Sequence, residues 1–174
     1  MKQDIVQLGA SVLRAKAKNI TQFERPELKT LVDHLLCTLE SSEGVGIAAP
    51  QINQSYCILI MSSKPTARYP NAPVMEPTIM INPSFKVRDD TQQKDWEGCL
   101  SIPGIRALVP RYQHILVRYQ TMKAEYQELA LNDFVARIFQ HEYDHLQGLV
   151  YLDRVNNNQD IISETEFYKR TKNK

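Results

Sequence analysis

The chain has 174 residues, with 21 Lys and Arg against 20 Asp and Glu, for a net charge of +1. A chain of this length fits one domain, residues 1–174, with a sizeable core, and its balanced charge gives no reason to expect a sequence-specific nucleic acid or another polyanion as partner. The three cysteines are an odd number without CxxC spacing, which argues against a disulfide framework and for a reducing compartment.

The first twenty residues give no functional signal. A short apolar piece, Ile5 to Leu8, precedes a mixed basic segment, Arg14 to Lys18, and no run long enough for a signal peptide follows Met1. The longest strongly apolar stretch, Cys57 to Met61, is far too short to cross a bilayer. We therefore expect a cytoplasmic protein with no membrane partner.

A helix is predicted to begin at Pro26, because proline is tolerated in the first turn of a helix and apolar residues follow at helical spacing. Its buried face would carry Leu28, Leu31, Val32, Leu35 and Leu39. His34 lies on this helix without a second ligand residue four positions away, so we interpret it as a surface or half-buried side chain.

A run of small residues, Gly44 to Ala49, follows this helix and ends at Pro50 and Gln51. Such a run lets a ligand approach backbone N–H and C=O groups closely, but it also occurs where a loop packs tightly under a sheet, and the sequence leaves both interpretations open. The run is not a phosphate loop, since it lacks G-x-G-x-x-G and a GK[ST] ending. Gln51 adds a side-chain amide with two donors.

The middle of the chain predicts several strands. They are Tyr56 to Met61, Thr78 to Ile81, Phe85 to Val87, Arg106 to Val109 and Ile115 to Tyr119, with Pro110 as a break between the last two. Ser62 to Pro77 holds four prolines and is predicted to be largely loop, because proline lacks the donor that a strand ladder needs.

A cysteine with glycine before it stands out between these strands, in the stretch from Trp96 to Gly104. Cys99 follows Gly98 and precedes Leu100. A lone cysteine is usually a buried structural thiol, but near a metal ion it would lose its proton and bind as a thiolate.

The segment from Asn132 to Gly148 predicts a helix that carries an H-E-x-x-H pattern. His141 and His145 are four residues apart and continue the apolar stripe of Phe134 and Ile138, so both imidazoles would face inward and could bind one metal ion. Glu142 could take a proton from water on that ion. Asn132 is a plausible N-cap and Gly148 a plausible C′ residue. The alternative is a pair of core histidines satisfied by hydrogen bonds.

The C-terminal stretch, Asn156 to Lys174, has a possible helix cap at Asp160 or Ser163. It closes with the basic residues Lys169, Arg170, Lys172 and Lys174. We interpret it as a solvated terminus, with a basic docking surface as the alternative.

Three stretches in this order resemble the peptide deformylase family: GVGIAAPQ (Gly44 to Gln51), EGCLS (Glu97 to Ser101) and QHEYDHLQG (Gln140 to Gly148). The resemblance implies an α+β fold, with antiparallel β-sheets around a central helix that bears the HExxH pattern and with an N-terminal and a C-terminal helix. The family often has glycine at the positions of Asn53 and Asp133. Asparagine can adopt the same left-handed conformation, and a helix start accepts the aspartate.

The resemblance also implies the site and its reaction. Cys99, His141 and His145 would bind one divalent metal ion, Fe²⁺ in the cell, with Zn²⁺, Ni²⁺ or Co²⁺ able to replace it. The family removes the N-formyl group from the initiator methionine of new polypeptides and releases formate. Water activated by the metal attacks the formyl carbon, with Glu142 as general base and then acid. The Gln51 amide and the Leu100 N–H would stabilise the oxyanion.

The peptide, by the same resemblance, would lie extended along the backbone near Val45, Gly46 and Gly98. Ile138 and Val45 are candidate walls of the methionine pocket, and Arg106 resembles an arginine that contacts the peptide backbone. A Glu97–Arg111 ion pair is expected to fix the Cys99 loop. Formylated nascent chains are the expected partners, and the resemblance makes the basic C-terminus a candidate for docking on the ribosome near the exit tunnel.

Two other functions are also compatible with the HExxH pattern. One is a zinc endopeptidase: the class with a third histidine in its motif is excluded, since Tyr151 stands at that position, but Glu164 or Glu166 could serve as a downstream ligand. The other is a catalytically inactive metal-binding module that recognises nascent N-termini. The presence of Glu142 and Gln51 argues against it.

Overall fold

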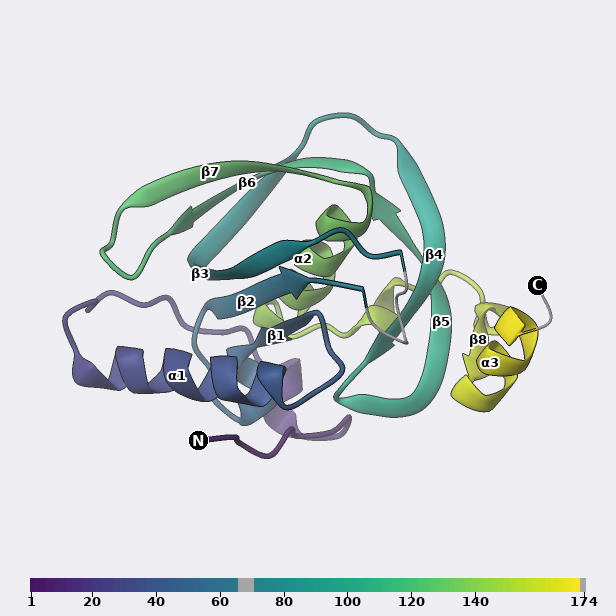
Figure 1. Ribbon diagram of the computed structural model, residues 1–174, viewed down its shortest axis with the longest axis horizontal. Coiled ribbons are helices and arrows are strands. Elements are labelled where there is room, and N and C mark those ends of the chain that lie inside the picture. The colour runs from purple at the N-terminus through teal and green to yellow at the C-terminus, as the bar shows by residue number, and fades with distance from the viewer. Residues whose placement is uncertain (66–70, 173–174) are drawn as a thin grey trace.

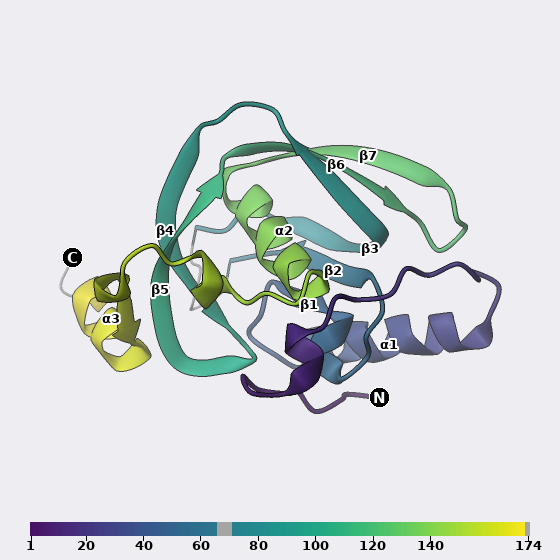
Figure 2. The same ribbon diagram turned by 180° about the vertical axis from the view of Figure 1, so that it is seen from behind.

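Helix α2 (Asp133–Leu146) packs against strands of both sheets and forms the centre of the fold (Figure 1). The computed structural model describes residues 1–65 and 71–172. Helix α1 (Pro26–Glu40) lies near the N-terminus, and helix α3 (Glu164–Lys172) lies beside the smaller sheet at the other end of the molecule (Figure 2). The expected α+β arrangement of antiparallel sheets around the HExxH helix is confirmed.

Two antiparallel sheets supply the framework, in the strand orders β1-β2-β3-β6-β7 and β4-β5-β8. The larger sheet consists of β1 (Gly46–Ala48), β2 (Ile58–Ser63), β3 (Met75–Val87), β6 (His114–Gln120) and β7 (Tyr126–Asn132). The smaller one consists of β4 (Gln92–Cys99), β5 (Ile102–Tyr112) and β8 (Ile161–Ser163). Short 3₁₀ turns are η1 (Ser11–Arg14), η2 (Ala49–Ile52), η3 (Tyr151–Arg154) and η4 (Asn158–Asp160). Strands β1 and β4 are each at the edge of their sheet.

Strand β2 is buried on both faces, which explains its continuous apolar sequence. Ile58 and Ile60 pack into the cluster that holds the apolar stripe of α1. Leu59 and Met61 point to the opposite face and join the cluster that includes Phe139 of α2. The two helices therefore cover opposite faces of the larger sheet, and α2 is held in place by its packing on β2.

The two strands predicted at 78–81 and 85–87 are one strand, β3. The register shifts between Ile81 and Ser84, and Asn82 there has a left-handed φ of 48°. Because of this irregularity, the sequence pattern of one continuous strand was interpreted as two strands. The prediction of a break at Pro110 is wrong, because this residue lies within β5 opposite Lys94. Strand β8 covers only residues 105–107 of β5, so Pro110 lies where β5 is an edge and its missing donor is tolerated.

The predicted loop from Ser62 to Pro77 is shorter than expected. Its residues 66–70 lie outside the described part of the chain, and β3 already begins at Met75 and includes Pro77. Between Met61 and Ser63 the register with β3 shifts, which places Pro77 opposite an irregularity where no regular ladder bond is needed.

The two ends of α2 differ from each other in how well the sequence predicted them. Asn132 is at the N-cap position but makes no capping bond, since its Oδ1 lies 2.9 Å from Nδ1 of His114. Asp133 has a left-handed φ of 49°. At the other end Gly148, with φ 75°, forms a Schellman motif: its N–H donates to His145 O, and the next N–H, that of Leu149, donates to Asp144 O.

The N-terminal segment Val6–Ala17, here called the N-terminal strap, crosses all three sequence motifs. Its backbone donates to backbone carbonyls at 2.8–2.9 Å, from Val6 to Gln51, from Leu8 to Ser101 and from Ala17 to Leu146. At the other end of the chain, the Ser163 Oγ accepts a bond from Glu166 N, so Ser163 is the cap of α3, whereas Asp160 belongs to η4. No helix in residues 1–65 and 71–172 has the length and apolar character needed to span a membrane.

Candidate metal centre and active site

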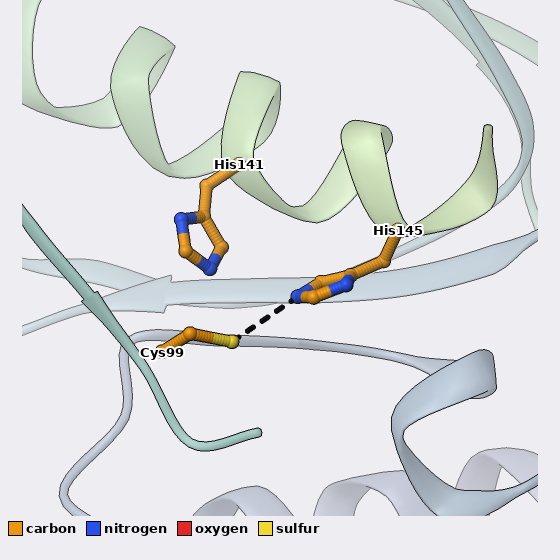
Figure 3. Close-up of side chains that lie close together, drawn as sticks. All are labelled: Cys99, His141 and His145. Carbon is orange, nitrogen blue, oxygen red and sulfur yellow. Dashed lines mark hydrogen bonds between the residues drawn. The ribbon is translucent and has the colours of Figure 1, made fainter. Parts of the chain in front are cut away.

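Three side chains that can bind a metal converge between α2 and the end of β4. His141 and His145 project from the same face of α2, one turn apart, toward Cys99 at the last position of β4 (Figure 3). Their ligand atoms all lie within 4.8 Å of one another, and Cys99 Sγ is 3.3 Å from His145 Nε2. Cys99 is 4% exposed and His145 is fully buried.

The donor set fits a divalent transition metal. One thiolate and two neutral imidazoles are ligands that zinc and iron accept. Burial raises the pKa of the Cys99 thiol, but the charges of the two histidines and their hydrogen bonds outweigh burial and hold it well below its ordinary value. A surrounding that favours thiolate also favours metal binding. The buried cluster opens on one side to a cavity lined by Cys99 and His141, and an open side is a feature of catalytic rather than structural sites.

Glu97 orients the first histidine ligand. Its Oε2 lies 2.9 Å from His141 Nδ1, which leaves Nε2 of His141 to face the cluster, as a metal-ligating histidine requires. Arg111 binds both carboxylate oxygens of Glu97 at 2.9 and 3.0 Å. Burial raises the pKa of Glu97, but Arg111 and the hydrogen bond from His141 outweigh it, so that the pKa lies far below its ordinary value. The expected Glu97–Arg111 pair is confirmed.

A wider network of charges ties these residues to α2. Arg137, one turn before His141, donates to Glu97 Oε1 at 2.9 Å and to the backbone carbonyl of Val109 at 2.7 Å. Arg111 also donates to Asp144 on α2 at 2.6 Å. Buried charges of this kind are costly unless every one is paired. Here the ion pairs fix the position of β4, which carries Cys99, relative to α2, which carries the two histidines.

Glu142 points into the cavity beside the cluster. The residue is 4% exposed, and its Oε2 has no hydrogen-bond partner among the described residues. Burial raises its pKa to about 7, with smaller contributions from His141, His145 and Cys99. A carboxylate with a pKa near neutrality and a free oxygen is suited to general acid–base work.

Gly46 makes the position of Glu142 possible. A Cβ at residue 46 would lie 2.6 Å from Glu142 Oε1 and 2.7 Å from its Cγ, closer than real Cβ contacts allow. Of the two interpretations of the small-residue run, this contact supports tight packing at position 46, whereas the approach of a ligand to its backbone stays a prediction. The glycine is needed for the close approach of a functional side chain.

Gln51 lies in η2, beside Cys99. Its Oε1 accepts a bond from Ala48 N at 2.8 Å, which fixes the amide so that Nε2 faces Cys99 Sγ at 3.5 Å and Ser101 Oγ at 3.4 Å. Both donor bonds are long, so the amide N–H can turn to a stronger acceptor. Leu100 lines the same cavity immediately after the cysteine.

The cavity brings together most of the predicted substrate-binding residues. Val45, Gly46, Gly98 and Ile138 line it. Arg106 does not: it is 1% exposed and donates to Glu164 Oε1 of α3 at 2.7 and 3.0 Å. The Arg106 guanidinium is therefore bound to α3, and the contact of Arg106 with substrate stays a prediction.

Sequence reasoning missed three further residues that line the cavity: Trp96, Phe134 and Arg137. Arg137 could have been found, since it is four residues before His141 and shares its helix face. For Trp96 the only signal was its place two residues before Gly98. The rival peptidase ligands are elsewhere, with Glu164 paired to Arg106 and Glu166 to Lys169.

The sequence profile of the Polypeptide deformylase family matches residues 2–160. The chain is 48% identical over 163 residues to Peptide deformylase 2 of a Nostoc species, covering 94% of this chain and 91% of that protein. The structure superposes with a TM-score of 0.86 on a class I type b peptide deformylase from Acinetobacter baumannii bound to Met-Ala-Ser, at 34% identity, covering 89% of this chain and 99% of that one. A peptide deformylase from Synechococcus elongatus in complex with actinonin gives a TM-score of 0.79 at 32% identity, covering 91% of this chain and 81% of that one.

Proposed function

The chain belongs to the polypeptide deformylase family, and from this membership we propose that it hydrolyses the N-formyl group of N-formylmethionyl polypeptides. One water is consumed, the bond between the formyl carbon and the methionine nitrogen breaks, and formate and a free amine are released. The observation that carries the proposal is the convergence of Cys99, His141 and His145 beside Glu142 in an open cavity. We also propose that residues 1–174 form one deformylase domain.

Cys99, His141 and His145 would hold the metal ion that the family requires. When bound, this ion supplies Lewis acidity, which lowers the pKa of water and polarises the formyl carbonyl. From the resemblance to the family we propose Fe²⁺ as the ion in the cell. Zn²⁺, Ni²⁺ or Co²⁺ could replace it, because a set of one thiolate and two imidazoles accepts each of them.

Glu142 is the proton carrier. Glu142 lines the cavity, one oxygen of its buried carboxylate has no hydrogen-bond partner among the described residues, and its pKa is about 7 before any metal is bound. It takes the proton of the attacking water and returns a proton to the methionine nitrogen as the C–N bond breaks. The close packing against Gly46 keeps the carboxylate in one orientation for both transfers.

Gln51 and Leu100 would stabilise the negative charge that develops on the formyl oxygen. The Gln51 amide is fixed by the bond from Ala48 N, and the Leu100 N–H follows the cysteine at the cavity. Donors fixed in advance in a site that excludes water are worth more than the same donors in water, because no reorganisation is needed.

The peptide would lie between two sheet edges. Strand β1, with Gly46 next to Val45, and strand β4, with Gly98, each end their sheet and can accept an extended chain as an added strand. The methionine side chain would enter the cavity between Val45 and Ile138. The Acinetobacter relative, which carries Met-Ala-Ser in its crystal structure, supports a tripeptide of this kind as a ligand.

Nascent chains in the cytoplasm are the proposed substrates, since formylmethionine begins new polypeptides there. The basic residues Lys169 and Arg170 on α3, with those that follow them, are proposed to dock on the ribosome near the exit tunnel. If a chain truncated after Asn158 sedimented with ribosomes as well as the full chain did, this docking would be disproved.

The test of the function is formate release from formyl-Met-Ala-Ser by protein loaded with Fe²⁺ or Ni²⁺. We expect turnover in the wild type, loss of metal in Cys99→Ala, and retained metal without turnover in Glu142→Gln. Glu164→Ala is the control, since a peptidase that used this glutamate would lose its metal. Cleavage of an internal peptide bond, or metal loss in Glu164→Ala alone, would instead establish the peptidase. Peptide binding without formate would establish the inactive binding module.

A further inference from the structure

The C-terminal helix α3 contacts a wall of the cavity, although none of its residues whose side chains the structure describes lines the cavity itself. Phe167 of α3 packs edge-on against Trp96, with ring centroids 5.6 Å apart and an interplanar angle of 66°. Trp96 is half-buried and lines the cavity. The indole therefore contacts α3 and also faces the space in which the peptide would lie.

Arg106 anchors α3 at this place. Its guanidinium makes two hydrogen bonds to Glu164, and its Cζ lies 5.1 Å from the centroid of the Phe167 ring. A buried arginine paired with a carboxylate on one side and an aromatic ring on the other gives a defined geometry rather than a loose contact. Figure 1 shows α3 beside β5 and close to β4, far from α1.

The position of Trp96 along β4 indicates which part of a peptide would meet it. Trp96 precedes the metal ligand Cys99 by three residues on the same strand, a distance of at most about 10 Å at ~3.3 Å per residue. An extended peptide whose formyl group is at the metal advances by the same rise per residue. Trp96 then faces the peptide about two residues beyond the methionine.

We propose that α3 acts as a positioning element of the active site, with Phe167 holding the Trp96 indole against the peptide about two residues beyond methionine, so that an apolar or aromatic side chain there is favoured. This inference rests on the proposed deformylase function. It assigns to α3 a part in substrate selection, and it assigns to Arg106 the anchoring of α3.

The test compares two substrates of different length, formyl-Met-Leu-Phe and formylmethionine amide, on metal-loaded protein. Phe167→Ala should raise KM for the tripeptide about 3- to 10-fold, the size of one lost aromatic contact, and leave kcat for the tripeptide and KM for the amide within about twofold. The conservative variant Phe167→Tyr, which keeps an aromatic ring against Trp96, should have the wild-type KM for the tripeptide. Tyr168→Ala is the matched control for the loss of an aromatic ring on this helix, because Tyr168 is 37% exposed and packs edge-on against Phe167, with ring centroids 5.4 Å apart, rather than lining the cavity.

Trp96 is the single tryptophan of the chain, so its fluorescence reports on the wall directly. Emission should shift to longer wavelength in Phe167→Ala, and the unformylated product Met-Leu-Phe should change the emission of the wild type at lower concentration than that of the variant. Trp96→Ala, which keeps the bonds from Arg106 to Glu164 that anchor α3, should reproduce the KM pattern if Phe167→Ala is too unstable to assay.

The inference is overturned if Phe167→Ala and Tyr168→Ala change KM alike, if both substrates are affected equally, or if Trp96→Ala leaves KM for the tripeptide unchanged. A failure of the proposed function itself would be distinguishable, because the wild type would then release no formate from either substrate.

Discussion

Replacing Gly46 with alanine tests whether the glycine exists to admit Glu142. The added Cβ would lie 2.6 to 2.9 Å from three atoms of the Glu142 side chain, and that side chain is buried. Overpacking of this kind costs about 1–3 kcal/mol, whereas a Gly-to-Ala change that the backbone tolerates returns about 0.4–1 kcal/mol through the unfolded state. The net loss should be about 1–2 kcal/mol, a fall in Tm of roughly 2–8 °C.

The effect on turnover should exceed the effect on stability. A shift of about 1 Å in a catalytic group can reduce the rate about 10²-fold, so kcat/KM for formyl-Met-Ala-Ser should fall by about that factor while metal content stays at one per chain. Formate release and metal analysis on the same preparation check both expectations.

Two further variants isolate the cause. Gly44→Ala is the matched control, since the nearest atoms to its new Cβ are the side-chain ends Leu100 Cδ1 at 3.0 Å and Ser42 Oγ at 3.2 Å, which can move aside. In the double variant Gly46→Ala, Glu142→Asp the shorter carboxylate leaves room for the methyl group, so stability should recover relative to the sum of the single changes. Wild-type kcat/KM in Gly46→Ala would refute the reasoning.

Three other predictions follow from the same structure. Gln51→Ala should keep the metal but lower kcat about 10²–10³-fold through the lost oxyanion donor, measured by formate release; an unchanged kcat would exclude that role. Gly148→Ala should cost more than Gly104→Ala in urea unfolding, because the two glycines have φ of 75° and 77° but only at 148 would the Cβ meet backbone, at 2.9 Å; equal losses would contradict the clash. Burial raises the pKa of Cys57 to about 11, so this thiol favours the folded state less as pH rises from 9 toward 11, and it should resist iodoacetamide at pH 8.5 while half-buried Cys37 reacts.

The helix with both histidines was predictable because its signals are local. Apolar residues at helical spacing, a pattern of three fixed positions and Gly148 at the end lie within one stretch of chain. Cys99 was different, since nothing in its own neighbourhood distinguishes a ligand from a structural thiol. Only the resemblance to a family selected it, and the structure then brought its sulfur to 3.3 Å from His145.

The features that the sequence did not predict depend on contacts between segments that are far apart in the chain. Arg137 binds Glu97 across 40 residues of sequence, and no periodicity in either segment indicates the other. The prediction that Pro110 breaks a strand failed for the same reason, because the length of β8 decides whether that part of β5 needs its donor. Likewise, the Arg106 guanidinium was expected at the peptide, and its partner on α3 is 58 residues later.

The N-terminal strap has a consequence for the order in which the chain becomes an enzyme. During synthesis Val6 and Leu8 are made before the carbonyls that they bind, at Gln51 and Ser101, and the Leu146 carbonyl bound by Ala17 is made after both. The strap therefore cannot complete its backbone pairing until Leu146 has been made. A protein that acts on the N-termini of other polypeptides thus finishes binding its own N-terminal strap only after its site residues have been made.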